Sequence, residues 1–231
     1  MLFFGLVSKK ERWGLTLWGW LFVCCLVIVT LAAAVFGVHP FLAVNEPVGG
    51  EILVMEGWMP DELVEKVIEI FKSEHYQRLV TTGGPLTYGS YLVGYKNCAE
   101  VAAASLKKLG LDERLIFVMP APDVPTDNTY AAGVSLRDWL TKSGTAVRSL
   151  DICTMGPHAR RTRLLFEKAL GDDVKVGVFA LESREYDPEI WWRTSKGVRT
   201  VLKEAVAYVY ARFFFWPNSL SGERRAVSAE R

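Results

Sequence analysis

Residues 150–161 run Leu150-Asp151-Ile152-Cys153-Thr154-Met155-Gly156-Pro157-His158-Ala159-Arg160-Arg161, a stretch in which an apolar run turns directly into a helix start. The run through Thr154 predicts a buried strand. Gly156 permits a tight turn, and Pro157 suits the first position of a helix. A strand that leads into a helix in this way is typical of a parallel α/β sheet.

The same alternation recurs on both sides of this stretch. Further apolar runs predict strands at 52–55, 78–82, 115–119 and 174–178. Amphipathic or capped segments predict helices from 61, over 97–109 and 126–140, from 157 to near 171, and over 191–215. Short apolar strands separated by helices predict a Rossmann-like parallel sheet with helices on both faces.

One long apolar segment precedes this domain. The chain has no Asp, Glu, Lys or Arg between Arg12 and Glu46, which predicts a transmembrane helix over 13–38. Lys9, Lys10 and Arg12 come before it, so the positive-inside rule places residues 1–12 in the cytoplasm and the domain on the periplasmic or outer face of the inner membrane. A cleaved signal peptide is the alternative, although the apolar region exceeds the usual length of its core.

The remaining chain divides by composition. Residues 39–50 form a linker, 51–216 have the size of one domain, and 217–231 are polar enough to predict a disordered tail. A net charge of +1 gives no general attraction to nucleic acid. Cys98 and Cys153 fall in the exported domain, where a disulfide is chemically allowed, and two free buried thiols are the simpler expectation.

The strongest candidate site follows the strand that ends at Thr154. A helix starting at Pro157 presents free N–H groups that attract an anion. His158 would add a proton donor, and Arg161 would add a forked cation for phosphate. The alternative is a plain helix start whose His158 and Arg161 face solvent.

Three further clusters follow other strands. Gly83 and Gly84 would let a ligand approach the backbone, and Glu100, one loop later, is a candidate general base or metal ligand. Asn97 to Glu100 also has capping-box spacing, so capping is an equal alternative for Glu100.

Asn128 and Thr129 open a predicted helix, and capping alone would explain them as well as substrate binding does. Glu56 ends the first strand. Because a buried, unpaired carboxylate is costly, Glu56 is expected to face the cleft or to have a cationic partner.

The order of these clusters resembles the ElyC/SanA/YdcF family, a bacterial envelope-associated group. The resemblance covers roughly residues 51–210 and rests on an ordered set of residues: Thr82-Gly83-Gly84, Glu100, Asn128-Thr129, Thr154, His158, Arg161, and Glu204 with Tyr208. Members of that family usually have glycines after the first strand, whereas this chain has Glu56-Gly57-Trp58. A carboxylate at Glu56 would repel a phosphate there unless a metal or an arginine intervenes, so either the ligand differs in this chain or the anion lies closer to His158.

This resemblance implies a role in cell-envelope biogenesis. The first hypothesis is an enzyme acting on a phosphate-bearing substrate, polyprenyl-linked or nucleotide-like, with His158 as general acid or nucleophile and Glu100 as base or metal ligand. The second is a non-catalytic ligand-sensing or scaffold module, since no known nucleophile motif is present. The sequence does not indicate whether a metal or a cofactor is required. One family member is associated with S-adenosylmethionine, but no methyltransferase-type glycine loop occurs here.

Overall fold

The computed structural model describes residues 15–90 and 93–216. The chain divides into two compact units, Met1–Gly37 and Val38–Arg231. The predicted cytoplasmic segment 1–12, with Lys9, Lys10 and Arg12, and the predicted tail 217–231 lie outside the described residues.

The apolar segment forms one helix, α1 (Leu17–Leu42), of 26 residues. At 1.5 Å per residue it is about 39 Å long. It is long and apolar enough to cross a membrane, a property that it shares with signal sequences. The helix continues through Pro40, so residues 39–42 of the predicted linker are helical rather than extended.

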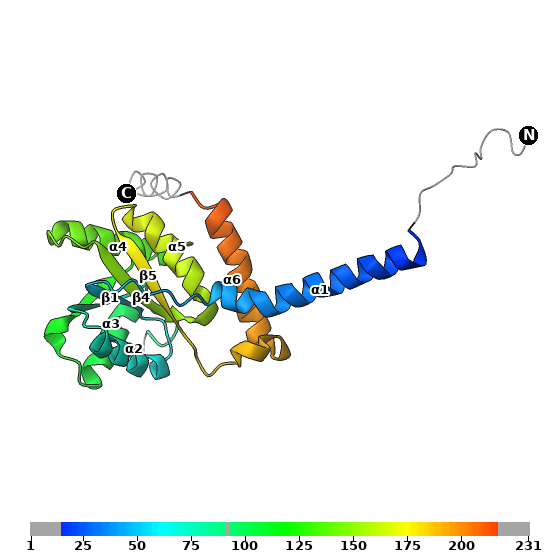
Figure 1. Cartoon of the computed structure of the whole chain (residues 1–231). Helices are drawn as coiled ribbons and strands as arrows, with labels where there is room; N and C mark the ends of the chain where they lie inside the picture. The colour runs from blue at the N-terminus through cyan, green and yellow to red at the C-terminus, as the bar shows by residue number, and fades with distance from the viewer. Residues whose placement is uncertain (1–14, 91–92, 217–231) are drawn as a thin grey trace, which may run out of the picture. The chain divides into compact units, whose positions relative to one another are not determined.

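The second unit contains five parallel strands in the order β3-β2-β1-β4-β5 (Figure 1), which confirms the predicted Rossmann-like α/β class. The strands are β1 (Ile52–Glu56), β2 (Arg78–Gly83), β3 (Ile116–Pro120), β4 (Ser149–Met155) and β5 (Lys175–Leu181). The helices are α2 (Asp61–Ser73), α3 (Cys98–Lys108), α4 (Asn128–Lys142), α5 (Ala159–Leu170) and α6 (Ser195–Phe213). Short 3-10 turns are η2 (Glu113–Leu115), η3 (Gly156–His158) and η4 (Pro188–Arg193).

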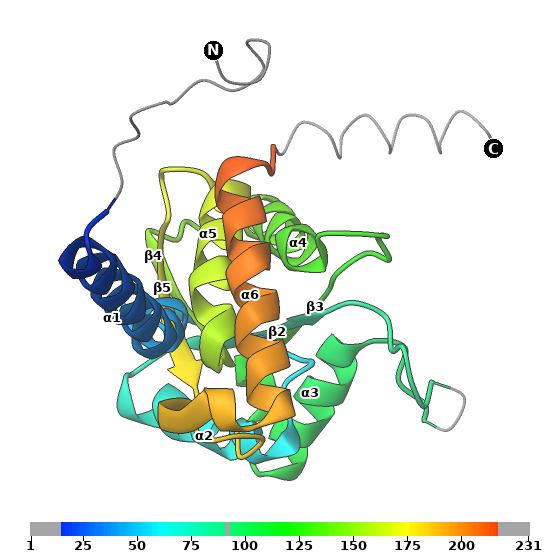
Figure 2. The same cartoon turned by 90° about the vertical axis from the view of Figure 1, so that its right-hand side faces the viewer.

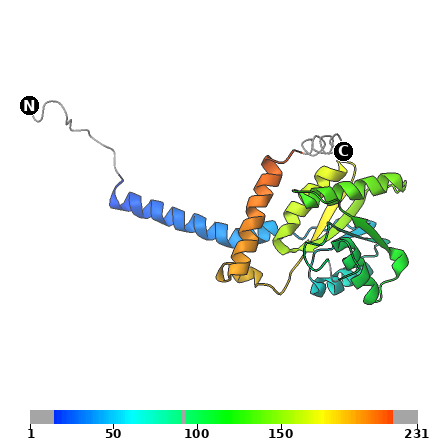
Figure 3. The ribbon, with the colours of Figure 1, turned by 180° about the vertical axis from the view of Figure 1, so that it is seen from behind.

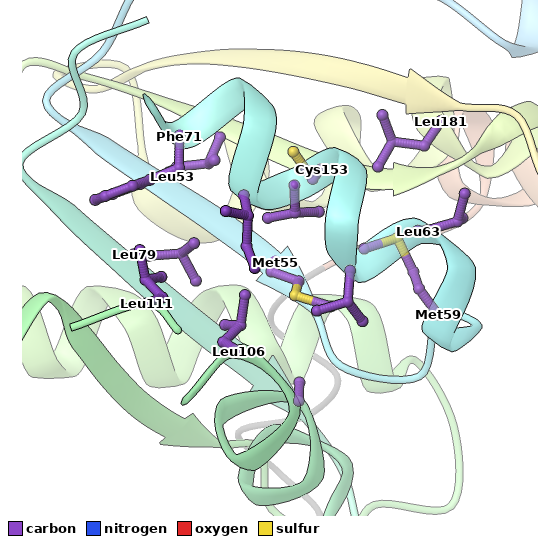
Figure 4. Packing of buried hydrophobic residues seen from close by; sticks show 14 of the residues in the cluster. Leu53, Met55, Met59, Leu63, Phe71, Leu79, Leu106, Leu111, Cys153 and Leu181 are labelled. Carbon is purple, nitrogen blue, oxygen red and sulfur yellow. The ribbon is translucent and has the colours of Figure 1, made fainter. Parts of the chain in front are cut away.

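Alternate residues of each strand face opposite sides of the sheet, so two cores form. Leu53 and Met55 of β1 pack with α2 and α3, as Figure 4 shows for Leu63 and Leu106. The other core lies against α4 and α5; it includes Ile52, Val54, Ala132, Leu136, Phe166 and Leu170. Glu56 has the same parity as Val54 and therefore belongs to the α4 and α5 face.

Helix α6 forms an additional layer on α5 (Figure 2, Figure 3). Ala211 and Phe215 pack there against Tyr130, Leu165 and Ala169. This places the start of α6 over the region in which β4 passes into α5, where α6 also contacts η3.

The opposite end of β4 is fixed by a second buried carboxylate. Asp151 is fully buried and accepts hydrogen bonds from the backbone N–H groups of Val48 and Gly50, at 2.7 and 2.9 Å, and from the hydroxyl of Tyr76 at 2.7 Å. Burial and this carboxylate raise the pKa of Tyr76 far above its usual value. The network ties the segment entering β1 to the sheet.

We expect Gly177→Ala to disrupt this network. A Cβ at Gly177 would lie 1.9 Å from Asp151 Oδ1 and 2.6 Å from the Val48 nitrogen. The free energy of unfolding should fall by about 2 kcal/mol, a typical cost of overpacking. Denaturant unfolding of the detergent-solubilised chain measures it. Gly94→Ala, whose Cβ would meet nothing within 4 Å, is the matched control, and equal stability of the two variants would contradict the expectation.

Candidate functional site

The strand order places a crevice between β1 and β4. These neighbours continue in opposite directions across the sheet, because β1 leads toward β2 and β4 leads toward β5. Ligands of open α/β sheets bind at such a switch point, beyond the carboxyl ends of the strands. The loop at Gly57 and Trp58 follows β1 here, and η3 follows β4.

Glu56 lies at the base of this crevice and is 3% exposed. Its Oε2 accepts hydrogen bonds from the hydroxyls of Thr154, at the end of β4, and of Thr162 on α5, the latter at 3.2 Å. Thr154 points to the same face as Glu56 because β1 and β4 are paired in parallel. Two hydroxyl donors therefore favour the ionised form of the Glu56 carboxyl.

His158 lies between two carboxylates. Its Nε2 is 3.5 Å from Glu56 Oε2, and its Nδ1 is 3.1 Å from Glu204 Oε2 on α6. The imidazole is 7% exposed. The Trp58 ring meets it edge to face, with the ring centroids 5.0 Å apart. The predicted alternative of a solvent-facing His158 is therefore wrong.

Arg161 completes the cluster from one turn further along α5. Its Nε donates to Glu204 Oε2 at 2.8 Å, and its Nη2 lies 3.3 Å from Oε1. The same Nη2 is 2.9 Å from His158 Nδ1. When Nδ1 carries a proton it donates to Glu204 and cannot accept from Arg161, so the guanidinium and the imidazolium then share one carboxylate.

These contacts shift three pKa values. Burial lowers the pKa of His158, but the carboxylates of Glu56 and Glu204 outweigh burial and leave the pKa above its usual 6.5. Burial raises the pKa of Glu56, and the charge of His158 with the hydroxyl donors outweighs it, so the pKa lies below 4.5. Burial likewise opposes ionisation of Glu204, yet His158 and Arg161 lower its pKa to about 2. Both carboxylates thus favour the imidazolium form of His158.

Within residues 15–90 and 93–216, three buried side-chain atoms have no hydrogen-bond partner: Thr81 Oγ1, Thr82 Oγ1 and His158 Nε2. Thr81 is opposite Met55 and faces the other side of the sheet, so only the last two concern the site. Glu56 is near enough to His158 Nε2 for charge attraction but is not aligned for a hydrogen bond. Thr82 is opposite Glu56 in the parallel register and shares its face. Unsatisfied groups of this kind are rare in protein interiors and mark places that take up a ligand or water.

An open cleft of about 410 Å³ lies against this cluster. Its walls come from the loops after β1, β4 and β5, from α5 and from the first half of α6. The lining residues are Trp58, Pro60, Met155, His158, Arg161, Glu185, Lys196, Thr200, Lys203 and Glu204. With His158 protonated, cationic groups outnumber carboxylates on this lining. Lys196 is paired with Glu185 at 2.9 Å, and no ion pair described for the second unit engages Lys203.

The structure brings together four of the residues predicted from sequence: Glu56, Thr154, His158 and Arg161. Of the two alternatives for Glu56, facing the cleft or having a cationic partner, the second agrees with His158 Nε2 lying 3.5 Å from its carboxylate.

Glu100 does not join them. Its backbone N–H donates to Asn97 Oδ1 at 2.9 Å, and its carboxylate accepts from Asn97 Nδ2 and from the Lys96 N–H, both at 2.8 Å. These bonds form a helix cap, and Glu100 is not part of the cleft lining described for the second unit. The predicted base or metal ligand is therefore better explained by the capping alternative.

The other predicted binding residues also lie outside that lining. A Cβ on Gly83 would come within 2.8 Å of the Cys98 Cβ, so this glycine lets α3 approach β2, whereas Gly84 faces open space. Asp127, at a φ of 58°, precedes α4 and makes no side-chain cap, so Asn128 and Thr129 are the first helical residues rather than the N-cap. Asn128 is exposed and Thr129 is buried.

Three members of the cluster were not predicted as site residues: Trp58, Thr162 and Glu204. Trp58 stands next to the singled-out Glu56, and Thr162 follows Arg161 directly. Glu204 appeared only within the resemblance, and its role depends on how α6 packs. That Glu204 is the one acidic residue of α6 was the available signal.

Metal-ligand clusters and cysteine pairs are the other kinds of site that the second unit could contain. Among the described residues, no group of three or more His, Cys, Asp or Glu is placed to hold a metal ion. Cys98 and Cys153 are both free; Cys153 is buried as expected, whereas Cys98 is only half-buried. Comparison with models of known protein families and with curated proteins found no match.

We expect His158→Gln to change how stability depends on pH. The folded state holds the His158 proton more tightly than the unfolded state, so its stabilisation is complete below pH 6.5 and is lost as pH rises through the raised pKa. At pH 6 the variant should lose about 3 kcal/mol of unfolding free energy, as when a buried pair is broken. Urea unfolding across pH 6–9 measures this.

The difference between wild type and His158→Gln should shrink as the pH rises. A difference that stays constant over this range would contradict a proton-linked role. On the acid side, the ionised Glu204 adds to the unfolding free energy above pH 4.5. This stabilisation is lost as the pH falls toward 2, so the unfolding free energy of both proteins should fall there.

We expect Glu100→Ala to act on the α3 cap alone. Loss of the cap should cost about 1 kcal/mol. Urea unfolding should show this loss equally at pH 6 and pH 9, because Glu100 does not contact the His158 cluster. A loss of stability only at the lower pH would instead indicate that Glu100 interacts with the His158 cluster.

Proposed function

We propose that this protein is a membrane-anchored enzyme that binds a phosphate-bearing substrate in the β1–β4 cleft and uses His158 as a general acid. The supporting observation is the position of His158 between the carboxylates of Glu56 and Glu204, with a buried Nε2 that makes no hydrogen bond to the described residues. A group held in its acid form near neutral pH suits proton donation to a leaving oxygen. It suits nucleophilic attack poorly, because a protonated imidazole has no free electron pair.

Charge in the cleft favours an anionic substrate. Arg161, Lys196 and Lys203 line it, and His158 precedes α5, whose N-terminus adds partial positive charge. Glu56 would repel phosphate oxygens at the base of the crevice. The phosphate is therefore placed toward Lys203 and Arg161, with the scissile oxygen facing His158 Nε2.

The anchor and the envelope role belong to the same proposal. Helix α1 would hold the domain at the inner membrane, on its periplasmic or outer face, where polyprenyl-linked phosphates are accessible. The order of site residues that resembles the ElyC/SanA/YdcF family supports a role in cell-envelope biogenesis. A nucleotide-like phosphate is the other substrate considered.

A ligand-sensing or scaffold module is the second candidate. One observation favours it: the described cleft lining contains no Ser, Cys or Asp that an adjacent base could activate. A sensor would use the same cations to bind phosphate without turnover.

The test measures binding and turnover separately on the full chain in detergent. The probes are a short polyprenyl diphosphate and a nucleoside diphosphate, with binding followed by calorimetry and hydrolysis by phosphorus NMR. We expect Lys203→Ala to weaken binding about tenfold, the effect of losing roughly 1.4 kcal/mol of charge interaction. Lys108→Ala, an exposed lysine on α3, is the matched control and should change neither quantity.

The variant His158→Gln separates the two candidates. Hydrolysis that is lost while binding is retained supports the enzyme. Binding by wild type with no hydrolysis of either probe supports the sensing module. No binding of either probe by wild type would contradict a phosphate-bearing ligand.

A further inference from the structure

Helix α6 has an apolar face that its own domain does not cover. Its buried side carries Gly197, Val201, Glu204 and Ala211. The opposite side carries exposed apolar residues at helical spacing: Leu202, Val206, Val209, Tyr210 and Phe213. Val206 is 71% exposed and Phe213 is 64% exposed. In Figure 2 this helix lies in front of α5, toward the viewer.

The exposed charges of α6 are all of one sign. Lys196, Arg199, Lys203 and Arg212 are its basic residues, and its one acidic residue, Glu204, is buried and paired with Arg161. Aromatic side chains continue the apolar face past the end of the helix, where Phe214 and Trp216 are exposed. A helix with an apolar aromatic face and basic flanks is typical of one that lies in the interface of an anionic membrane.

Chain connectivity keeps the second unit close to any bilayer that α1 enters. The strongly apolar part of α1 ends at Phe36. Phe41 already belongs to the second unit, where its ring centroid lies 5.5 Å from that of Tyr208 on α6. Four residues separate Phe36 from Phe41, and the distance along the chain is only about 8 Å as helix. The second unit is therefore joined by a short segment to any membrane that α1 enters.

We infer that the outer face of α6 is a membrane-docking surface that lies in the interface of the bilayer into which α1 inserts, with anionic phospholipid as its partner. The inference rests on the proposed anchoring by α1. Docking of α6 would also fix where the cleft lies relative to the membrane. Lys196, Thr200, Lys203 and Glu204 of α6 also line the cleft, so docking would hold the cleft beside the headgroups, where a lipid-linked phosphate lies.

Spin labels on the full chain in phosphatidylglycerol-containing vesicles test the inference. Cys24, Cys25 and Cys98 are replaced by serine, and buried Cys153 is kept. Single labels are placed at V206C and F213C on α6, at V27C in α1, and at Y88C, an exposed position in the β2–α3 loop. Collision rates with oxygen, which partitions into lipid, and with a water-soluble nickel complex report the surroundings of each label.

We expect the α6 labels and the α1 label to have a severalfold higher oxygen-to-nickel ratio than the Y88C control. Nickel access at V206C and F213C equal to that at Y88C, with V27C still lipid-exposed, would overturn the docking surface and leave the anchor intact. Spin–spin broadening at V206C would mean that a second copy covers the face, which also overturns it. Nickel access at V27C would overturn the anchor and the inference together.

Discussion

The position of Glu56 is the constraint on which the site depends. A carboxylate at the end of a central strand, 3% exposed, is costly unless hydrogen bonds and a positive charge compensate it. The hydroxyls of Thr154 and Thr162 supply the first, and His158 supplies the second. His158 is itself buried and needs Glu204, which in turn holds Arg161. Compensation therefore extends from the sheet through α5 to α6.

The proton on His158 matters both for the stability of the fold and for the proposed chemistry. The two carboxylates hold His158 in its acid form, which keeps the buried charges balanced. The same proton is the one that Nε2 would donate to a substrate in the cleft. Loss of this proton removes positive charge from between Glu56 and Glu204, and an anion bound beside Lys203 would favour the protonated imidazole, so substrate binding and proton transfer are coupled through the cluster. A buried ion network is weak evidence of stability by itself, but removing one of its partners is costly because the other charge is left buried and uncompensated.

Much of the fold could be predicted because its signals are local. Apolar runs such as 52–55 and turns such as Gly156-Pro157 mark strands and helix starts within a few residues. The site was predictable only in part. The need of Glu56 for a cation follows from burial, but Glu204 joins through packing of a distant helix, which no spacing reveals. Glu100 shows the converse, since its local capping pattern explains it without any ligand.

The most direct test of this account is the protonation state of His158. Nitrogen NMR of the imidazole, in protein labelled at histidine and assigned by comparison with His158→Gln, reports protons on Nδ1 and Nε2 separately. The account predicts that both nitrogens carry a proton at pH 7 and that the titration midpoint lies above 6.5. A neutral imidazole at pH 7, titrating below 6.5, would contradict it.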